Sequence, residues 1–345
     1  MAKYCFLFFV LFIDIHSGDA QINGLDHDTA YYHSYRDDLT GRTFFSRKYT
    51  ELILNPSGKT PEIFNKTNTT LNVGLGATFH FLTINLAVGL NSFNPSQEKG
   101  KTHYLDLQSH FYSRKWNIDL LGEFYRGYFL SPKGLGSANP SNYYLRPDLS
   151  VQYGGISAFR ALNEKKFSYQ AGLLQNEWQQ KSAGSVLIGV ESYYGAIDGD
   201  SSLVTAKVDT SFARKGIDRV HFFEIGPGVG YAYTLVIKKH YFVLASAGIN
   251  LDLRYSLEIE ALSHQNRWDL FPNFIFHAGA GYNSNKWVLS VVWVDDQIHV
   301  QGNASEYKYR ITTGNYRLIY AVRFGLSRKT KRSIEKAAPV LIENK

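Results

Sequence analysis

Four residues in one stretch of this sequence could together perform acid–base chemistry or bind a charged ligand. Within residues 102–128, Asp106, His110, Asp119 and Glu123 are ionisable members of an alternating polar and apolar pattern. Paired carboxylates can share a proton, hold a cation or act as general acid and base, and a carboxylate favours the protonated form of a neighbouring histidine. What these side chains do depends on how the stretch folds.

The stretch predicts its own pairing. If Arg114-Lys115 is a two-residue turn between antiparallel strands, His110 faces Asp119. Asp106 then faces Glu123 on the same side of the hairpin. The other side pairs only apolar residues, namely Leu105 with Phe124 and Phe111 with Ile118. Because both faces are consistent, the pattern supports this register.

Two carboxylates directly opposite each other repel, so Asp106 and Glu123 need compensation. Three explanations remain open: a wide, wet lumen that solvates both, an arginine–carboxylate network that closes the lumen, or a cation or substrate site. Three arginines point to the same side by strand alternation and are the candidate partners, namely Arg160, Arg317 and Arg323. Together with the four residues above they form the candidate lumen site. No catalytic residue, metal site or cofactor is predicted.

Alternation with a period of two runs through most of the chain and predicts an all-β protein. It is clear in residues 70–81, 82–90, 102–113, 116–128, 148–162, 167–180, 224–236, 241–253, 269–282 and 287–301. The non-apolar face consists mainly of Gly, Asn, Ser, Thr and Gln. That composition fits the wet interior of a barrel better than the charged outer face of a soluble β-sandwich. We therefore expect an antiparallel transmembrane β-barrel over residues 43–326.

Short basic turns alternate with longer polar segments, which is the layout of outer-membrane barrels. Strands at 43–54, 185–197 and 201–212 and a final strand at 316–326 bring the expected total to about 14, or about 12 if 198–219 is a loop. A shift of apolar parity in the last strand predicts a bulge near Gly314. Aromatic residues beside the short turns predict an interfacial girdle. They are Phe79, Phe81, Trp116, Phe167, Tyr241, Tyr282 and Trp287.

The chain ends read as separate segments. Lys3, the apolar run 4–13 and the small residues of Gly18-Asp19-Ala20 predict a signal peptide over residues 1–20. Residues 21–42 then form a polar periplasmic lead-in, and 327–345 form a basic periplasmic tail. The single cysteine lies in the signal peptide, so the mature protein would have no thiol chemistry.

Composition narrows the function classes. Apolar residues make up 44% and aromatic residues 15% of the chain, which excludes a disordered protein. No stretch approaches the roughly 18 consecutive apolar residues of a membrane-spanning helix. The net charge of +7 could suggest nucleic acid, but the basic residues fall at recurrent turns and the chain carries a secretion signal. We expect no nucleic-acid partner.

Several stretches resemble a family of outer-membrane β-barrels from Bacteroidota that is catalogued only as a domain of unknown function. The resemblance lies in YYHSYRDDLTGRTFFSRKYT (31–50), TLNVGLGATFHFLTINLAVG (70–89), KTHYLDLQSHFYSRKWNIDLLGEFYRGYFL (101–130), QKSAGSVLIG (180–189) and GYAYTLVIKKHYF (230–242). It implies an integral barrel in the cell outer membrane and no reaction. One departure is that the last strand ends near 324–326 and a tail follows, whereas such strands usually finish the chain with an aromatic residue.

The sequence supports three functional hypotheses. The first is a passive pore or small-solute transporter, and the second is a closed structural or interaction barrel without transport. The third, an outer-membrane lipid hydrolase, is weak because His80 and His110 point inward by parity and no catalytic motif is present. The expected partners are outer-membrane lipids, the barrel assembly machinery and a periplasmic protein that contacts the tails.

Overall fold

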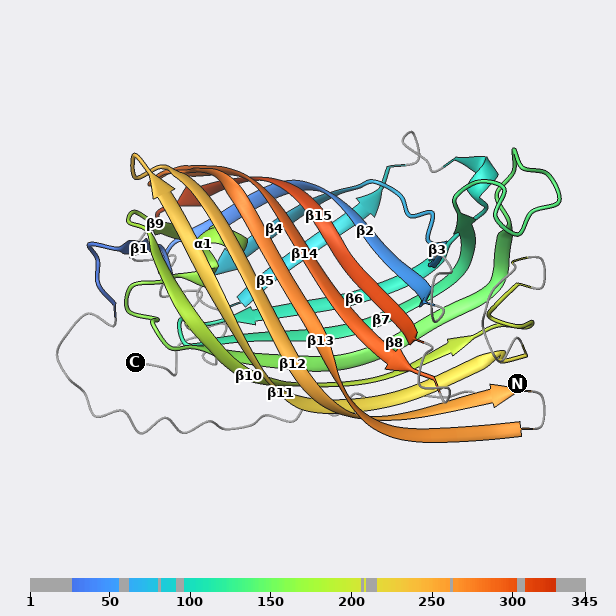
Figure 1. Ribbon diagram of the computed structural model, residues 1–345. Helices are drawn as coiled ribbons and strands as arrows, with labels where there is room; N and C mark the ends of the chain where they lie inside the picture. Colours follow the sequence, from blue (N-terminus) through green and yellow to red (C-terminus); the bar gives the residue numbers. More distant parts are fainter. Residues whose placement is uncertain are drawn as a thin grey trace.

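The computed structural model describes residues 27–55, 62–79, 82–90, 96–205, 208, 216–260, 263–302 and 308–326. In these residues the chain forms an antiparallel β-barrel with long, strongly tilted strands (Figure 1). The only α-helix of the described residues is five residues long, and no helix there could cross a membrane. The predicted signal peptide and tail lie outside these residues.

Ten strands close the ring in the order β2, β15, β14, β13, β12, β11, β10, β8, β7, β3 and back to β2. Their bounds are β2 Leu39–Asn55, β3 Ile63–Lys66, β7 Trp116–Ser131, β8 Leu145–Ala161, β10 Ala183–Asp198, β11 Arg219–Ile237, β12 Tyr241–Glu260, β13 Ser263–Asn283, β14 Trp287–Gln301 and β15 Lys308–Phe324. The predicted all-β antiparallel barrel is therefore confirmed.

Three further strands extend the wall from both sides but do not close it. β4 (Asn72–Phe79) pairs with β2, β5 (Leu82–Gly89) pairs with β4, and β6 (His103–Tyr112) pairs with β7. In the described residues no backbone ladder joins β5 to β6. β3 bridges β2 and β7 at one end of the barrel, so the break between β5 and β6 belongs to the other end.

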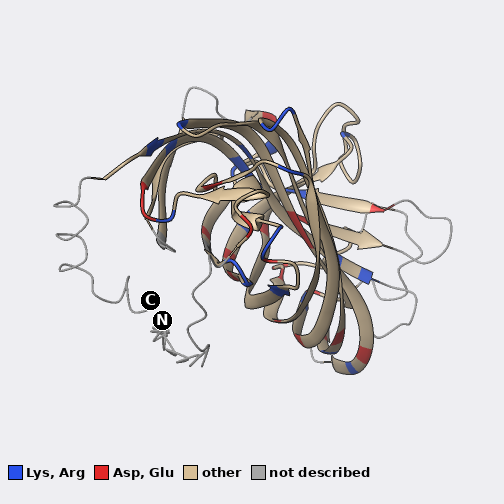
Figure 2. Cartoon of the chain, turned by 90° about the vertical axis from the view of Figure 1, so that its left-hand side faces the viewer, with Lys and Arg blue, Asp and Glu red and all other residues tan. Residues whose placement is uncertain are grey.

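The two ends of the barrel differ. Tight turns at 113–115, 238–240 and 284–286 lie at one end, called the short-turn end, and long connections such as 132–144 lie at the opposite, long-loop end. Figure 2 views the protein from the short-turn end, where lysines and arginines mark the turns. β1 (Tyr32–Ser34), β9 (Glu177–Gln179) and α1 (Tyr169–Leu173) lie together at this end.

The hairpin formed by β6 and β7 has the predicted register. His110 pairs with Asp119 and Asp106 with Glu123. The outward residues Leu105 and Phe124 are exposed, while Glu123 is fully buried. The prediction was correct because a tight turn and two self-consistent faces leave one register.

Four details of the strand prediction are wrong. Residues 167–180 do not form one wall strand, because α1 covers Tyr169–Leu173 and only Glu177–Gln179 are a strand, which pairs with β1 outside the barrel sheet. The described part of 201–212 contains no strand, and Leu203 and Val204 pack into the interior instead. Gly314 carries no bulge, because β14 and β15 pair without a register shift past it. The parity shift has another cause: Ile311 faces an apolar part of the interior. Phe167 is buried and does not belong to a girdle.

The outer wall is apolar over a continuous band. On β12 the outward residues from Tyr241 to Leu253 alternate with buried inward ones. Twelve residue steps at about 3.3 Å and a tilt of about 45° give a band about 28 Å high, close to the hydrocarbon thickness of a bilayer. At its short-turn edge Tyr282 packs against both Tyr241 and Trp287, as the predicted girdle requires.

Two apolar clusters fill the interior. The cluster at the short-turn end surrounds α1 and includes Tyr169, Leu173 and Leu244. The cluster at the long-loop end includes Leu54 near the end of β2, Ile197 near the end of β10 and other buried residues. A polar layer lies between them, so the barrel is filled from end to end.

Candidate functional site

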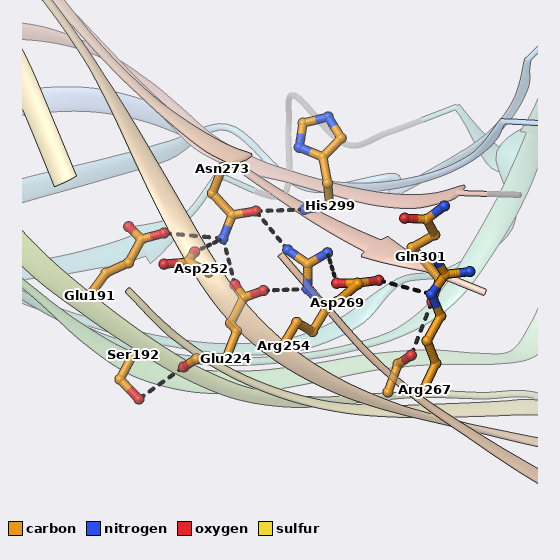
Figure 3. A network of polar contacts seen from close by, with 11 residues as sticks. Glu191, Ser192, Glu224, Asp252, Arg254, Arg267, Asp269, Asn273, His299 and Gln301 are labelled. Carbon is orange, nitrogen blue, oxygen red and sulfur yellow. Dashed lines mark hydrogen bonds and ion pairs between the residues drawn. The ribbon is translucent and has the colours of Figure 1, made fainter. Parts of the chain in front are cut away.

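The polar layer contains a group of fully buried charged residues on four neighbouring strands, here called the carboxylate network (Figure 3). Its members are Glu191 on β10, Glu224 on β11, Asp252 and Arg254 on β12, and Asn273 on β13. Each is at most 1% exposed. Strand alternation places them on the inner face, and each stands in a strand whose outward residues are apolar.

Asn273 lies at the centre of the network. Its amide nitrogen Nδ2 is 2.6 Å from Glu224 Oε1, 2.6 Å from Asp252 Oδ2 and 3.1 Å from Glu191 Oε1. One amide group has only two hydrogens, so it cannot donate fully to all three carboxylates at once. Asn250 supplies a further donor, 2.7 Å from Glu191 Oε2. The three carboxylates are thus held by neutral amides on one side.

Arg254 supplies the nearest positive charge. Its Nε donates to Glu224 Oε2 at 2.7 Å, and its Nη2 donates to the side-chain amide oxygen Oδ1 of Asn273 at 3.3 Å. Asp269 lies 3.6 Å from Arg254 Nη1 and 3.5 Å from the Nε of Arg267. These contacts extend the network toward the long-loop end, as Figure 3 shows.

The network has an excess of negative charge. Glu191, Glu224 and Asp252 each offer an oxygen within 4.8 Å of the others, and among the described residues Arg254 is the one cation that forms an ion pair with them. Carboxylates this close need a proton or a cation between them as well. Three hard oxygen donors at this spacing are the kind of set that Ca²⁺ or Mg²⁺ accepts.

The predicted pair Asp106 and Glu123 is compensated in a different way from the one expected. Asp106 forms an ion pair with Lys48 and accepts a hydrogen bond from the Tyr125 hydroxyl at 2.9 Å. Glu123 accepts from two threonine hydroxyls, those of Thr50 at 2.9 Å and Thr313 at 2.6 Å. A closed polar network therefore exists here, but lysine, tyrosine and threonine form it.

The three predicted arginines do not contact these carboxylates. Arg160 is exposed on the outer face, because the inward positions of β8 are the odd-numbered ones, such as Tyr153 and Phe159. Arg323 does face inward, but it donates to carbonyl oxygens, including those of Gln175 at 2.7 Å and Glu177 at 3.0 Å. Of the three explanations left open for Asp106 and Glu123, the arginine–carboxylate network is therefore wrong.

Arg317 faces inward next to a second arginine, Arg42 on β2. Its guanidinium carbon lies 5.8 Å from the ring centre of Phe44, and the two arginines are close enough to repel each other. Neither forms an ion pair with a described carboxylate. Asp119, the partner of His110 in the register, accepts a hydrogen bond from Tyr112 at 2.8 Å.

Sequence reasoning missed the carboxylate network although its signal was present. Glu191, Glu224 and Asp252 are isolated acids at inward positions of otherwise apolar or small-residue strands. The alternation of inward and outward positions along each strand could have identified these three acids. That they converge depends on the relative stagger of four strands, and the long connection between β10 and β11 leaves part of that stagger undetermined by local pattern.

The predicted lead-in is part of the short-turn end. Tyr32 in β1 is fully buried, and β1 pairs with β9 inside the chain's own barrel. Burial raises the pKa of Glu177 in β9, which accepts a hydrogen bond from the Ser168 hydroxyl. Arg323 ties this segment to the wall through its carbonyl contacts. Residues 28–38 and 167–179 thus close this end of the barrel.

Residues 26–324 match the model of a family described as "Domain of unknown function (DUF4421)". This chain belongs to that family. The matched region runs from just before β1 to the last residue of β15, so barrel and short-turn segment form one family unit. No curated protein matches the chain.

Solved outer-membrane barrels show a distant likeness. The outer membrane protease OmpT from Escherichia coli is 8% identical, with 85% of this chain and 98% of that chain covered and a TM-score of 0.36. OmpT of Vibrio cholerae is 8% identical over 82% and 98%, with a TM-score of 0.25. The P. putida toluene transporter TodX is 7% identical over 84% and 91%, with a TM-score of 0.23. Scores this low carry no inference about activity.

Proposed function

We propose that this protein is an integral outer-membrane β-barrel with a closed lumen, which serves as a structural or interaction barrel and not as a passive pore. Its outer surface supports the membrane location. Large apolar side chains such as Val229, Ile249 and Leu251 are about half exposed around the middle of the wall. A water-facing wall would leave a large apolar patch uncovered, whereas lipid covers it without cost.

The observation that carries the closed lumen is the packing of the middle layer. Asp252 and Arg254 are 0% exposed, and so is Glu224. A channel even one water molecule wide would leave inward side chains accessible. In the described residues apolar clusters lie above and below this layer, which supports a lumen closed to ions.

The test is a recording from protein whose insertion is demonstrated separately. Protein refolded into lipid vesicles should migrate faster on gels before heating than after heating, which shows a folded barrel. The same preparation should show no discrete conductance steps in planar bilayers and no vesicle swelling with small sugars. Reproducible unitary steps would contradict the closed lumen and favour the pore. A soluble, monomeric protein that does not enter vesicles would contradict the membrane location.

A further inference from the structure

Arg42 and Arg317, here called the arginine pair, lie on the inner face of β2 and β15 with no acidic partner. Among the described residues Arg42 has one hydrogen-bond partner, the Thr78 hydroxyl, and its Nε is buried without any. The Nε of Arg317 is also buried without a partner. Arg42 is only 7% exposed, so water reaches little of this side chain, while Arg317 is half-buried.

The nearest acid is already engaged. Asp106 acts electrostatically on Arg317, but it pairs with Lys48 and accepts from Tyr125. Two arginines, one lysine and one aspartate leave an excess of two positive charges. A buried charge is costly unless it is paired. This part of the wall therefore favours binding of an anion that carries one or two negative charges.

The arginine pair lies beside the break in the wall. Arg42 pairs with Gly76 on β4, and Gly76 pairs with Asn85 on β5, so all three share the inner face. A Cβ at Gly76 would collide with the Asn85 amide and press on the stem of Arg42, so these two side chains meet above the glycine. Yet Asn85 is exposed, which means that the interior does not cover β5.

The outer side of the same place is apolar. Ile84, Leu86 and Val88 alternate with the inward residues of β5 and are 57%, 73% and 68% exposed. β5 has no partner strand on this edge in the described chain. A ligand here would therefore meet cations on the inner face and aliphatic side chains on the outer one.

The height of the arginine pair also fits a lipid. Gly41, next to Arg42, lies against the Phe324 ring, and Arg42 pairs with Ala321 beside Tyr320. Tyr320 contacts Trp287 of the girdle. Aromatic girdles mark the level of lipid headgroups, so a lipid phosphate would lie level with the two guanidinium groups.

We propose that the arginine pair binds the phosphate group of an anionic membrane lipid lying at the break between β5 and β6. Arginine presents several N–H donors in a planar fork that suits phosphate oxygens, and Asn85 adds a neutral donor. The acyl chains lie along the aliphatic outer side of β5. This proposal takes the membrane location from the proposed function but does not depend on whether the lumen conducts.

Native mass spectrometry of protein released from nanodiscs tests the proposal. The nanodiscs contain phosphatidylcholine with a minor fraction of phosphatidylglycerol, and a neutral maltoside detergent releases the protein. The wild type should retain one phosphatidylglycerol molecule. R42Q with R317Q should lower the retained fraction at least about tenfold, because both charge-assisted contacts are lost. R160Q with R219Q, which removes two exposed arginines, should retain lipid like the wild type.

The outcomes separate the alternatives. Equal retention by the wild type and R42Q with R317Q would overturn the proposal, as would a folded wild type that retains no lipid. Displacement of the lipid by millimolar inorganic phosphate would show a free-anion site and overturn the lipid assignment. If R42Q with R317Q does not fold, R42K with R317K keeps the charge and loses the fork, and reduced retention is then the expected result. Conductance recordings, which test the lumen, are independent of all these readings.

Discussion

Two regions of the barrel interior contain buried or half-buried arginines and differ in how the charge is compensated. In the carboxylate network Arg254 contacts Glu224, Asp269 and the Asn273 carbonyl oxygen. In the arginine pair, Arg42 has a single hydroxyl partner among the described residues. One region has more acids than cations and the other has cations without acids.

The difference indicates that the carboxylate network stabilises the fold, whereas the arginine pair is suited to bind a ligand. The network lies at the middle of a complete wall, where β10 to β13 form continuous ladders. The arginine pair lies beside β5, which like β6 has a single partner strand in the described chain. Polar groups that hold a barrel together need internal partners, whereas polar groups at a break in the wall can take them from outside.

The largest expected effect comes from removing the cation of the network. Arg254→Met leaves Glu224 and Asp269 buried with their main positive partner gone, and breaking a buried pair on one side costs about 3–5 kcal/mol. Urea unfolding in lipid vesicles, followed by gel migration without heating, measures the loss. A free energy of unfolding within about 1 kcal/mol of the wild type would show that the network does not depend on Arg254.

The second effect concerns the outside of the same wall. Val229→Arg places a charge at mid-band on β11, where it should cost about 2–4 kcal/mol against lipid. Leu75→Arg is the matched control, since Leu75 is 70% exposed and pairs with Thr43, four residues from the short-turn start of β2 at Leu39. It should cost about 0–1 kcal/mol because an interfacial arginine reaches the headgroups. Equal costs would mean that the band is placed wrongly.

The third effect concerns Asp106 and Glu123, whose surroundings contain both acids and a lysine. Asp106→Asn with Glu123→Gln removes both facing carboxylates, leaves Lys48 without its partner and weakens the Tyr125 bond. Hydrogen bonds to charged groups contribute about 1.5–3 kcal/mol each, so a loss of about 1–3 kcal/mol is expected. Conductance should stay absent. A wet lumen predicts the opposite result, unchanged stability with altered ion selectivity.

The sequence predicted what local pattern determines. It placed most strands and the register of the β6–β7 hairpin, because period-two alternation and a tight turn are properties of adjacent residues. It did not predict the filled interior, since Leu54 and Ile197 look like ordinary strand residues until their strands are brought together. Arg160 shows the same limit, because one residue of parity reverses the face on which a side chain lies.

A smaller effect is expected from a buried carboxylate with a hydroxyl donor instead of a cation. Burial raises the pKa of Glu177 above its ordinary value of 4.5, so the folded state holds that proton more tightly than the unfolded state. The stability it contributes is present at low pH and falls as the pH rises from about 4.5 through the raised pKa. Glu177→Gln should therefore flatten the pH dependence of unfolding in mild acid. A parallel profile for both proteins would contradict the burial of this carboxyl group.

The smallest expected effect is on the other side of the comparison. Arg42→Met with Arg317→Met removes two buried charges that have no acid to lose, so the protein in vesicles of zwitterionic lipid should keep its free energy of unfolding or gain slightly. Arg254→Met in the same vesicles is the contrast. Adding anionic lipid should stabilise the wild type, because a ligand that binds only the folded state shifts its equilibrium, and should leave the double variant unchanged. A large loss of stability in zwitterionic lipid would place the arginine pair among the groups that hold the barrel together, and the two regions would then not differ in kind.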